Sequence, residues 1–499
     1  MKVIKRDGRV VDYDRNKITI AIEKANNEVI EEKEKASKED IKIITNYIEK
    51  IDKKRILVED MQDIIEQKLM EIGKYELAKK YIVYRYTRAL VRKSNTTDET
   101  ILGLIRNQNK SDNEKSKDTL KASTQRDYIA GEVSRDLTKR LLLPEKISKA
   151  NEDGILYFHN SDYFVQPIIN YCVTDVKDML YNGTIINDVK IEEPKSFERA
   201  CNILTQIISQ VGSNLYGKQY IDLSCLGKFL RKSRENYKNE LKYKFKDKID
   251  DKQIEELSDE FETNQLKDGV QTINYQLKTL NTTGGKRPNV ILYLDLNHEK
   301  EYLKENLKIK EELVNQMPEE VSEEKYKFLG KFNQGIVSIN LPQIAISADE
   351  DEEKFYKILD ERLELCKEAL MCRHYQLLGT ISDVSPILWQ NGGIARLNSG
   401  EKIDKLLYSK YSNLSLGYIG TNEMAELIKS TSTVEEKNKF IISVIKNLKE
   451  TIEKWKEETN IGFILDGNPP ECVGYKFAIK DRERYGTIKN VTDKGYYTN

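Results

Sequence analysis

Three basic side chains near the start of the chain have the character of a phosphate-binding site. Lys5 and Arg6 end a short predicted strand and Lys17 opens the first predicted helix, so the three converge where a hairpin meets that helix. Val3 and Ile18 flank them and offer apolar contact to a purine. Together these residues predict a nucleotide site. The alternative is a solvated basic hairpin, since 33% of the chain is charged.

Sulfur is the second possible source of chemistry. The six cysteines are Cys172, Cys201, Cys225, Cys366, Cys372 and Cys472. None forms a C-x-x-C pair, which argues against a zinc ribbon or a thioredoxin motif, and we expect no disulfides. Cys366 and Cys372 lie six positions apart on one predicted helix and therefore point to different faces, so we expect them to be packing residues.

A small domain over residues 1–92 must position the basic residues. Asp7-Gly8 is typical of a hairpin turn, because glycine reaches positive φ at little cost. Apolar residues at helical spacing then predict four helices. Their stripes are Ile18, Ala21, Ile22 and Ala25; Ile41, Ile44, Ile48 and Ile51; Met61, Ile64, Ile65, Leu69 and Ile72; and Leu77, Tyr81, Tyr84 and Arg85. The expected domain is one hairpin on a bundle of helices.

The composition excludes several classes of protein. Lys plus Arg is 82 and Asp plus Glu is 83, a formal net charge of −1, which argues against a general nucleic-acid or membrane-surface binder. The first residues are charged, and no apolar run approaches the ~18 residues of a membrane helix. We expect a cytoplasmic protein without nucleic-acid or membrane partners.

The rest of the chain alternates between predicted strands and helices. Residues 93–126 are polar and predict a linker, followed by a second domain over 127–499. Apolar patterns predict buried strands at 289–296, 335–346 and 462–465 and amphipathic helices at 129–141, 204–215 and 355–370. This alternation implies an α/β fold with a mostly parallel sheet.

Several motifs resemble one enzyme family. KRDG, then Lys17-Ile18, then YIVYR at 81–85 resemble an ATP-cone, the nucleotide-sensing module of many ribonucleotide reductases. In order, NYCVTD, GIVSINLPQIAI, SLGYIGTNE and GFILDGNPPE are similar to the catalytic barrel of anaerobic (class III) ribonucleoside-triphosphate reductases. The resemblance implies a ten-stranded α/β barrel over 127–499, incomplete at its C-terminus. It also implies ATP or dATP as allosteric effectors, with Gln62 among the polar residues of the cone.

The resemblance also implies radical chemistry. In the family a glycyl radical on a C-terminal loop oxidises a cysteine inside the barrel, and the thiyl radical abstracts the 3′-hydrogen of the substrate ribose. A zinc site, a radical-SAM activase, a reductant and a homodimer belong to the same scheme. The stripe at 204–215 is either the dimer surface or ordinary core. In the family, the zinc site and glycyl loop follow the segment that matches KGYYT, whereas the printed sequence ends at Asn499. We therefore expect both to be absent from this chain and supplied by a separate glycyl-radical chain.

Two departures from the family pattern bear on catalysis. No cysteine lies between Cys225 and Cys366, and KYKFLG at 325–330 stands where the family has C-R-S-F-L-G with its thiyl cysteine. Tyr171 stands where the family has its reducing cysteine, with sulfur one position later at Cys172. Because one step along a strand reverses the face, Cys172 is predicted to point away from a substrate. The alternatives for Cys172 are redox work and a buried structural thiol.

Five further positions match places near the family's active site. Asn340 corresponds to a polar residue of the active-site floor, or else caps a strand end. His159 corresponds to an active-site histidine, or else is a hydrogen-bonded structural residue. Asn468, Pro469 and Glu471 stand where the family has a T-P-S-E loop near the substrate phosphates, or else form a plain turn.

Two functions therefore remain open at this level. The chain is either an anaerobic reductase that works with a separate radical-bearing chain, or a catalytically dead nucleotide-sensing regulator of a complete reductase. The missing internal cysteine predicts that the chain alone reduces nothing.

Overall fold

The computed structural model describes residues 2–4, 10–27, 29, 31–51, 55–86, 101, 122–296, 299–317, 330–408, 411–467 and 472–498. The chain divides into two compact units, Met1–Asn109 and Lys110–Asn499. Most of the linker expected at 93–126 lies outside the described residues, and helix α5 already begins at Ala122. None of the described helices has the length and apolar character that a membrane crossing requires.

The N-terminal unit is a small sheet packed on helices. Its sheet has the order β2-β1-β3, with β1 antiparallel to β2 and parallel to β3. The elements are β1 (Lys2–Ile4), β2 (Val10–Asp12), α1 (Arg15–Asn26), α2 (Lys38–Glu49), β3 (Arg55–Leu57) and α3 (Val58–Glu71), and residues 75–86 are also helical. The predicted hairpin and helices are present, although the Asp7-Gly8 turn lies outside the described residues. The three-residue strand β3 was not predicted, because so short a segment carries no periodic signal.

Local sequence explains where these helices begin and which faces they bury. Asp14 accepts a hydrogen bond from the Asn16 backbone N–H at the start of α1, and Ser37 forms a capping box with Asp40 at the start of α2. The predicted apolar stripes form the core of the unit, with Ile22, Ile44, Ile48 and Leu69 all fully buried.

The second unit is built on a seven-stranded mixed sheet. Its order is β12-β11-β10-β5-β8-β9, and β4 also pairs with β10. The strands are β4 (Leu156–Phe158), β5 (Tyr171–Thr174), β8 (Gln219–Asp222), β9 (Val290–Tyr293), β10 (Phe332–Asn340), β11 (Ser412–Ile419) and β12 (Gly462–Asp466). A separate hairpin joins β6 (Thr184–Ile186) to β7 (Val189–Ile191).

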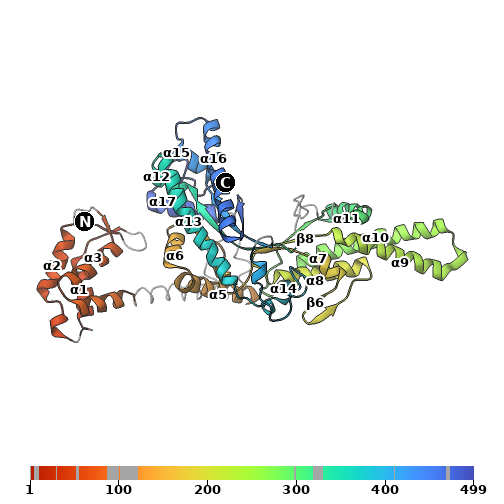
Figure 1. Ribbon diagram of the computed structural model, residues 1–499, viewed down its shortest axis with the longest axis horizontal. Coiled ribbons are helices and arrows are strands. Elements are labelled where there is room, and N and C mark those ends of the chain that lie inside the picture. Colours follow the sequence, from red (N-terminus) through yellow and green to blue (C-terminus); the bar gives the residue numbers. More distant parts are fainter. Residues whose placement is uncertain are drawn as a thin grey trace. The chain divides into compact units, whose positions relative to one another are not determined.

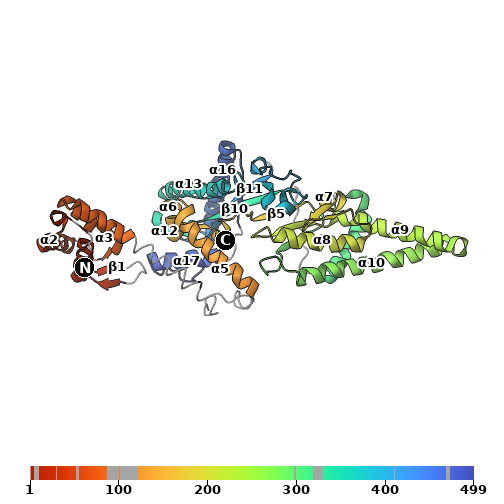
Figure 2. The same cartoon turned by 90° about the horizontal axis from the view of Figure 1, so that it is seen from below.

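Two parallel halves of this sheet run in opposite directions. Strands β5, β8 and β9 are parallel to one another, and so are β10, β11 and β12, whereas β10 is antiparallel to β4 and β5. The halves meet where β10 lies beside β5 (Figure 2). The α/β class is therefore confirmed, with seven strands in the described part of the sheet.

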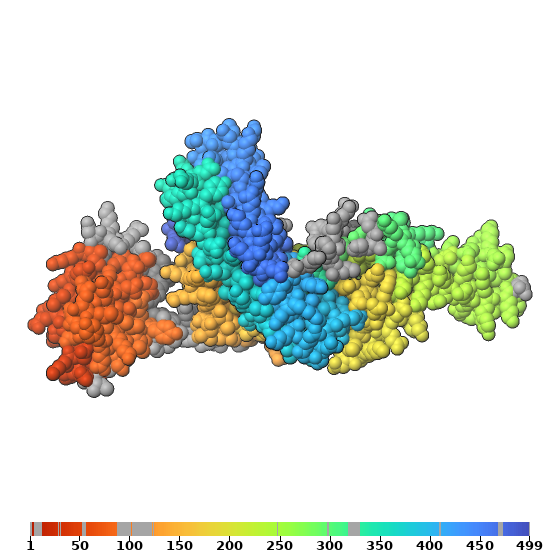
Figure 3. Space-filling model, in the orientation of Figure 1, coloured from red at the N-terminus to blue at the C-terminus, as the bar shows by residue number. Residues whose placement is uncertain are grey.

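Helices pack around the sheet (Figure 1). They are α5 (Ala122–Leu137), α6 (Glu145–Glu152), α7 (Val176–Tyr181), α8 (Phe197–Gly212), α9 (Gly227–Phe245), α10 (Asp251–Thr279), α11 (Leu303–Gln316), α12 (Leu341–Ala348), α13 (Glu352–Leu377), α14 (Pro386–Trp389), α15 (Thr421–Ile428), α16 (Val434–Thr459) and α17 (Cys472–Tyr485). A π-helical turn at Thr138–Leu142 follows α5. Helix α8 buries its apolar stripe against the β5-β8-β9 half. Helices α13 and α16 bury their apolar stripes against the β10-β11-β12 half of the sheet. They lie side by side on the surface (Figure 3).

Three predicted segments differ from the structure. The strand expected at 335–346 ends at Asn340, because Asn340 caps a new helix and Pro342 occupies its first turn. The stripe at 129–141 is not core, since Val133 and Leu141 are exposed. The stripe of α8 is core and not a free surface: Leu204, Ile207, Ile208 and Val211 are fully buried, a spacing that serves either purpose equally well from sequence.

Candidate functional site

One pocket in the N-terminal unit collects the predicted nucleotide-binding residues that the structure describes. Val3 from β1, Lys17 and Ile18 from α1 and Gln62 from α3 line the same open pocket, whose volume is about 620 Å³ when the solvent at its mouth is included. Its other lining residues are Asp12, Asp14, Ala21, Val58, Met61, Ile65 and Tyr81. The predicted Lys5 and Arg6 lie outside the described residues.

The chemistry of this pocket suits a ligand with a flat apolar part and a charged part. Val3 and Ile18 are nearly fully buried, whereas the side chain of Lys17 is 72% exposed. Lys17 lies 3.6 Å from the carboxylate of Asp14, so an incoming phosphate would compete with Asp14 for the ammonium group. Sequence reasoning missed Asp12, Asp14 and the buried Tyr81, although Tyr81 belongs to the YIVYR run.

In the second unit, the face of the sheet away from α8, α13 and α16 carries several polar side chains. Tyr171 on β5, Tyr220 on β8 and Tyr293 on β9 form one cluster on this face, with the rings of Tyr171 and Tyr220 packed edge to face at 5.7 Å. The hydroxyl of Tyr171 is hydrogen-bonded to the side chains of Asn413 and Ser415, and burial raises its pKa. The position of the expected reducing cysteine is thus filled by a hydrogen-bonded phenol.

An amide network extends from this cluster across three strands. The side-chain amide of Asn170 donates to the Oδ1 of Asn333 at 2.9 Å. The amide of Asn333 in turn donates to Asn413 Oδ1 at 2.6 Å and to Ser415 Oγ at 2.9 Å. Buried amides need such partners, so the network fixes the relative register of β5, β10 and β11 on the polar face.

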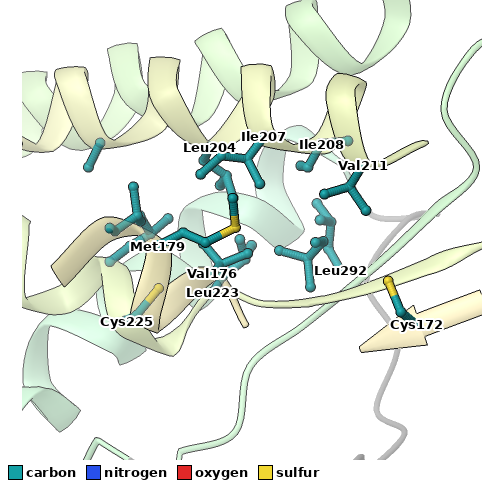
Figure 4. Close-up of a cluster of buried hydrophobic side chains, with 14 of the residues drawn as sticks. Cys172, Val176, Met179, Leu204, Ile207, Ile208, Val211, Leu223, Cys225 and Leu292 are labelled. Atoms are coloured by element: carbon teal, nitrogen blue, oxygen red, sulfur yellow. The ribbon is translucent and has the colours of Figure 1, made fainter. Parts of the chain in front are cut away.

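Cys172 faces the opposite way. Its side chain is 0% exposed and packs in the apolar cluster between β5 and α8, with Cys225 in the same cluster (Figure 4). Its Sγ lies 3.5 Å from Thr174 Oγ1, and burial raises its pKa to about 12. The face predicted from strand alternation is confirmed. The thiol lies where the structural alternative put it and away from Tyr171.

We expect Cys172 to resist alkylation in the native protein. A thiol must be deprotonated and accessible to react, and Cys172 is neither, whereas Cys372 is partly exposed. Iodoacetamide at pH 8 should modify Cys372 at least about ten-fold faster than Cys172, as followed by peptide mass spectrometry. Equal rates of modification of Cys172 and Cys372 in the native protein, before any denaturant is added, would contradict this placement.

His159 occupies a buried position at the end of β4. Its Nε2 lies 2.8 Å from Ser338 Oγ on β10, and its ring packs edge to face on Tyr157 at 4.8 Å. Burial, with the nearby cations Arg373 and Lys476, lowers its pKa to about 3. The imidazole is therefore neutral in the folded protein, and it holds β4 against β10.

A pH dependence of stability follows from His159. Its pKa is about 3 when folded and 6.5 when unfolded, so the unfolded chain binds more protons between these values and stability falls as pH drops below 6.5. From pH 7 to pH 5 the wild type should lose about 2 kcal/mol more unfolding free energy than His159→Gln. Urea unfolding at both pH values measures the difference, and an identical pH dependence in the two proteins would refute it.

Asn340 joins three elements at the end of β10. Its amide donates to the Gly154 carbonyl and to Asp481 Oδ2, both at 2.9 Å, and its Oδ1 accepts from the Gln343 backbone N–H at 3.2 Å. Asp481 on α17 is fully buried and also accepts from Gln343 Nε2 at 2.6 Å and the Tyr497 hydroxyl at 2.9 Å. Asn340 therefore ends β10, caps helix α12 and anchors α17.

Some predicted site residues are not placed. Asn468, Pro469 and Glu471 lie outside the described residues, as do 325–329 of the segment that replaces the thiyl loop. In the part of the chain that the structure describes, no three His, Cys, Asp or Glu side chains converge in a metal-binding arrangement.

The two units can be compared with solved structures. A helical module with an open pocket precedes an α/β unit whose sheet joins two parallel halves that run in opposite directions. This fold is that of solved ribonucleotide reductases. Solved structures agree: the anaerobic ribonucleotide reductase from Thermotoga maritima in complex with dATP and CTP superposes with a TM-score of 0.60 at 16% identity, over 81% of this chain and 80% of that chain.

Sequence comparison makes the family specific. The model of the anaerobic ribonucleoside-triphosphate reductase family matches residues 112–328 and 319–499, and the ATP cone domain model matches 1–90. The chain is 29% identical to the anaerobic ribonucleoside-triphosphate reductase of Haemophilus influenzae, covering all of this chain and 81% of the relative. The Escherichia coli protein is 28% identical over 89% of this chain and 73% of that relative. The chain belongs to the anaerobic ribonucleoside-triphosphate reductase family and begins with an ATP cone.

Proposed function

We propose that this chain is a nucleotide-sensing member of its family that does not itself reduce ribonucleotides. The pocket lined by Val3, Lys17, Ile18 and Gln62 carries the sensing half of the proposal. ATP and dATP are the proposed effectors, in keeping with the match of residues 1–90 to the ATP cone domain. In this proposal the cone spans residues 1–92 and the barrel 127–499, with 93–126 as the linker between them.

The proposed lack of catalysis is supported by the absence of cysteine at the two positions where the family has its reducing and thiyl cysteines. The phenol of Tyr171 holds the place of the reducing cysteine on the polar face, and the thiols of Cys172, Cys201 and Cys225 pack in the apolar core on the other side. By sequence, Lys325 replaces the thiyl cysteine. Hydrogen abstraction from a ribose needs a sulfur on the polar face, and neither expected position supplies one.

One observation favours a second function, in which the chain is part of an active reductase. The amide network of Asn170, Asn333 and Asn413 keeps the polar face of the sheet intact, which suits a substrate-binding surface. In that case a separate glycyl-radical chain, with its zinc site and a radical-SAM activase, would complete a homodimeric enzyme. The two functions separate in an anaerobic assay with and without such a chain.

Nucleotide binding by the full chain tests the sensing proposal. Calorimetry should give saturable heat with ATP or dATP, and Lys17→Met should weaken binding by about ten-fold, because one charge-assisted contact to phosphate is lost. Lys24→Met is the matched control: Lys24 is an exposed lysine in the last turn of the same helix, outside the pocket, and its loss should change affinity less than about two-fold.

Two results would count against the sensing proposal. One is the absence of heat with either nucleotide in a folded protein. The other is equal weakening by Lys17→Met and Lys24→Met, which would indicate general charge attraction and no specific site.

A further inference from the structure

Arg85 joins the helix at residues 75–86 to α3 in the N-terminal unit. Its Nη2 donates to Glu59 Oε2 at 2.5 Å. Its Nη1 donates to Asp63 Oδ1 at 2.6 Å and to Glu66 Oε1 at 2.9 Å. All three carboxylates belong to α3, at positions i, i+4 and i+7, so they follow one line along that helix. A single guanidinium therefore holds three points on the neighbouring helix.

The two helices that Arg85 joins also form one wall of the pocket proposed to bind nucleotide. Met61, Gln62 and Ile65 of α3 line that pocket, and so does Tyr81 of the helix at 75–86. Tyr81 is 3% exposed and lies one turn before Arg85 on the same face of its helix. The side chain that reaches the pocket and the side chain that binds α3 are thus neighbours.

Partial burial and charge make this contact more than an ordinary surface ion pair. The side chains of Arg85 and Glu66 are 22% and 18% exposed, so water screens their attraction less than it screens a fully exposed pair. The guanidinium presents several donors in a rigid plane, which lets it hold more than one carboxylate, whereas a lysine is a point charge. Without it, the three carboxylates on one line of α3 would repel one another.

We propose that Arg85 is a positioning residue of the nucleotide pocket: by binding the carboxylates of α3, it holds Tyr81 in place opposite the α3 side of the wall. This inference rests on the proposed nucleotide binding and explains how the pocket keeps its shape. Arg85 is not among the residues that line the pocket. Its effect on a bound nucleotide therefore passes through Tyr81.

Calorimetry on the full chain with ATP and with dATP tests the proposal through two variants that change the charge in opposite directions. Arg85→Gln removes a positive charge, whereas Glu59→Ala combined with Glu66→Ala removes two negative charges. Each variant breaks the contact, so each should weaken nucleotide binding by about ten-fold. A simple field effect on the polyanionic nucleotide would give opposite results: weaker binding in Arg85→Gln and tighter binding in the double variant.

Arg15→Gln is the matched control. Arg15 also joins two helices, because it donates to Asn46 Oδ1 at 2.9 Å and lies 3.6 Å from Glu49 on α2. Helix α2 contributes no residue to the pocket, so this change should alter affinity less than about two-fold. A double-mutant cycle gives a second readout: in a Tyr81→Leu background, Arg85→Gln should weaken binding by less than about two-fold, because its route to the nucleotide is already lost.

Weaker binding in both charge variants, with little change in Arg15→Gln, supports the positioning role. Opposite effects in the two charge variants, unchanged affinity in both, equal weakening by Arg15→Gln, or full additivity with Tyr81→Leu overturns it. If Arg85→Gln does not fold, the double variant still decides, since it removes like-charge repulsion from α3: unchanged or tighter binding overturns the proposal. Absence of heat with the folded wild type overturns the proposed nucleotide binding, and this inference with it.

Discussion

Replacing Asn340 with alanine is expected to lower the free energy of unfolding by about 3 kcal/mol. Three hydrogen bonds are lost at once, and one of them is a charge-assisted bond to the fully buried carboxylate of Asp481. Helix α12 also loses its cap, which by itself costs about 1 kcal/mol. Urea denaturation followed by circular dichroism measures the loss.

The control for this prediction is Asn202→Ala. Asn202 donates to the Glu198 carbonyl on the exposed face of α8, so its loss should cost less than about 0.5 kcal/mol. If Asn340→Ala is as stable as Asn202→Ala, the network around Asp481 is not what holds α17 to the end of β10. Nucleotide binding by the cone should be unaffected by either change, since neither residue lines that pocket.

No deoxynucleotide is expected when the chain is incubated anaerobically with an activase, formate and a nucleoside triphosphate. The reaction needs a sulfur at the inner loop and another at the reducing position, where this sequence has Lys325 and Tyr171. Phenol and amine groups cannot replace a thiyl radical in that scheme. Product is measured by chromatography of labelled nucleotide, and turnover should remain at the background level.

A complete reductase of the family serves as the positive control in the same assay. Product above background from this chain alone would show that hydrogen abstraction has another agent and would remove the catalytic half of the proposal. Product that appears only when a separate glycyl-radical chain is added would select the second function. A change in the activity of the complete reductase on adding this chain, dependent on ATP or dATP, would select the regulator.

Several features were determined by the sequence alone, because they depend on local periodicity. The stripes of α1, α2, α3, α8 and α13 are buried as predicted, since residues three and four apart share one helix face wherever the helix lies. The direction of Cys172 follows from alternation in the same way. The family resemblance rested on short motifs, and their order along the chain was sufficient to identify the family.

Other features were decided only by tertiary structure, because they join residues far apart in sequence. Asn340 meets Asp481 across 141 positions, a contact that no local pattern predicts. Lys17 and Gln62 share a pocket only because α1 and α3 pack together. Arg373 packs against Gly335, where any side chain would clash with it. Periodicity fixes which face of an element is buried, but the partner across that face is fixed by packing of the whole chain.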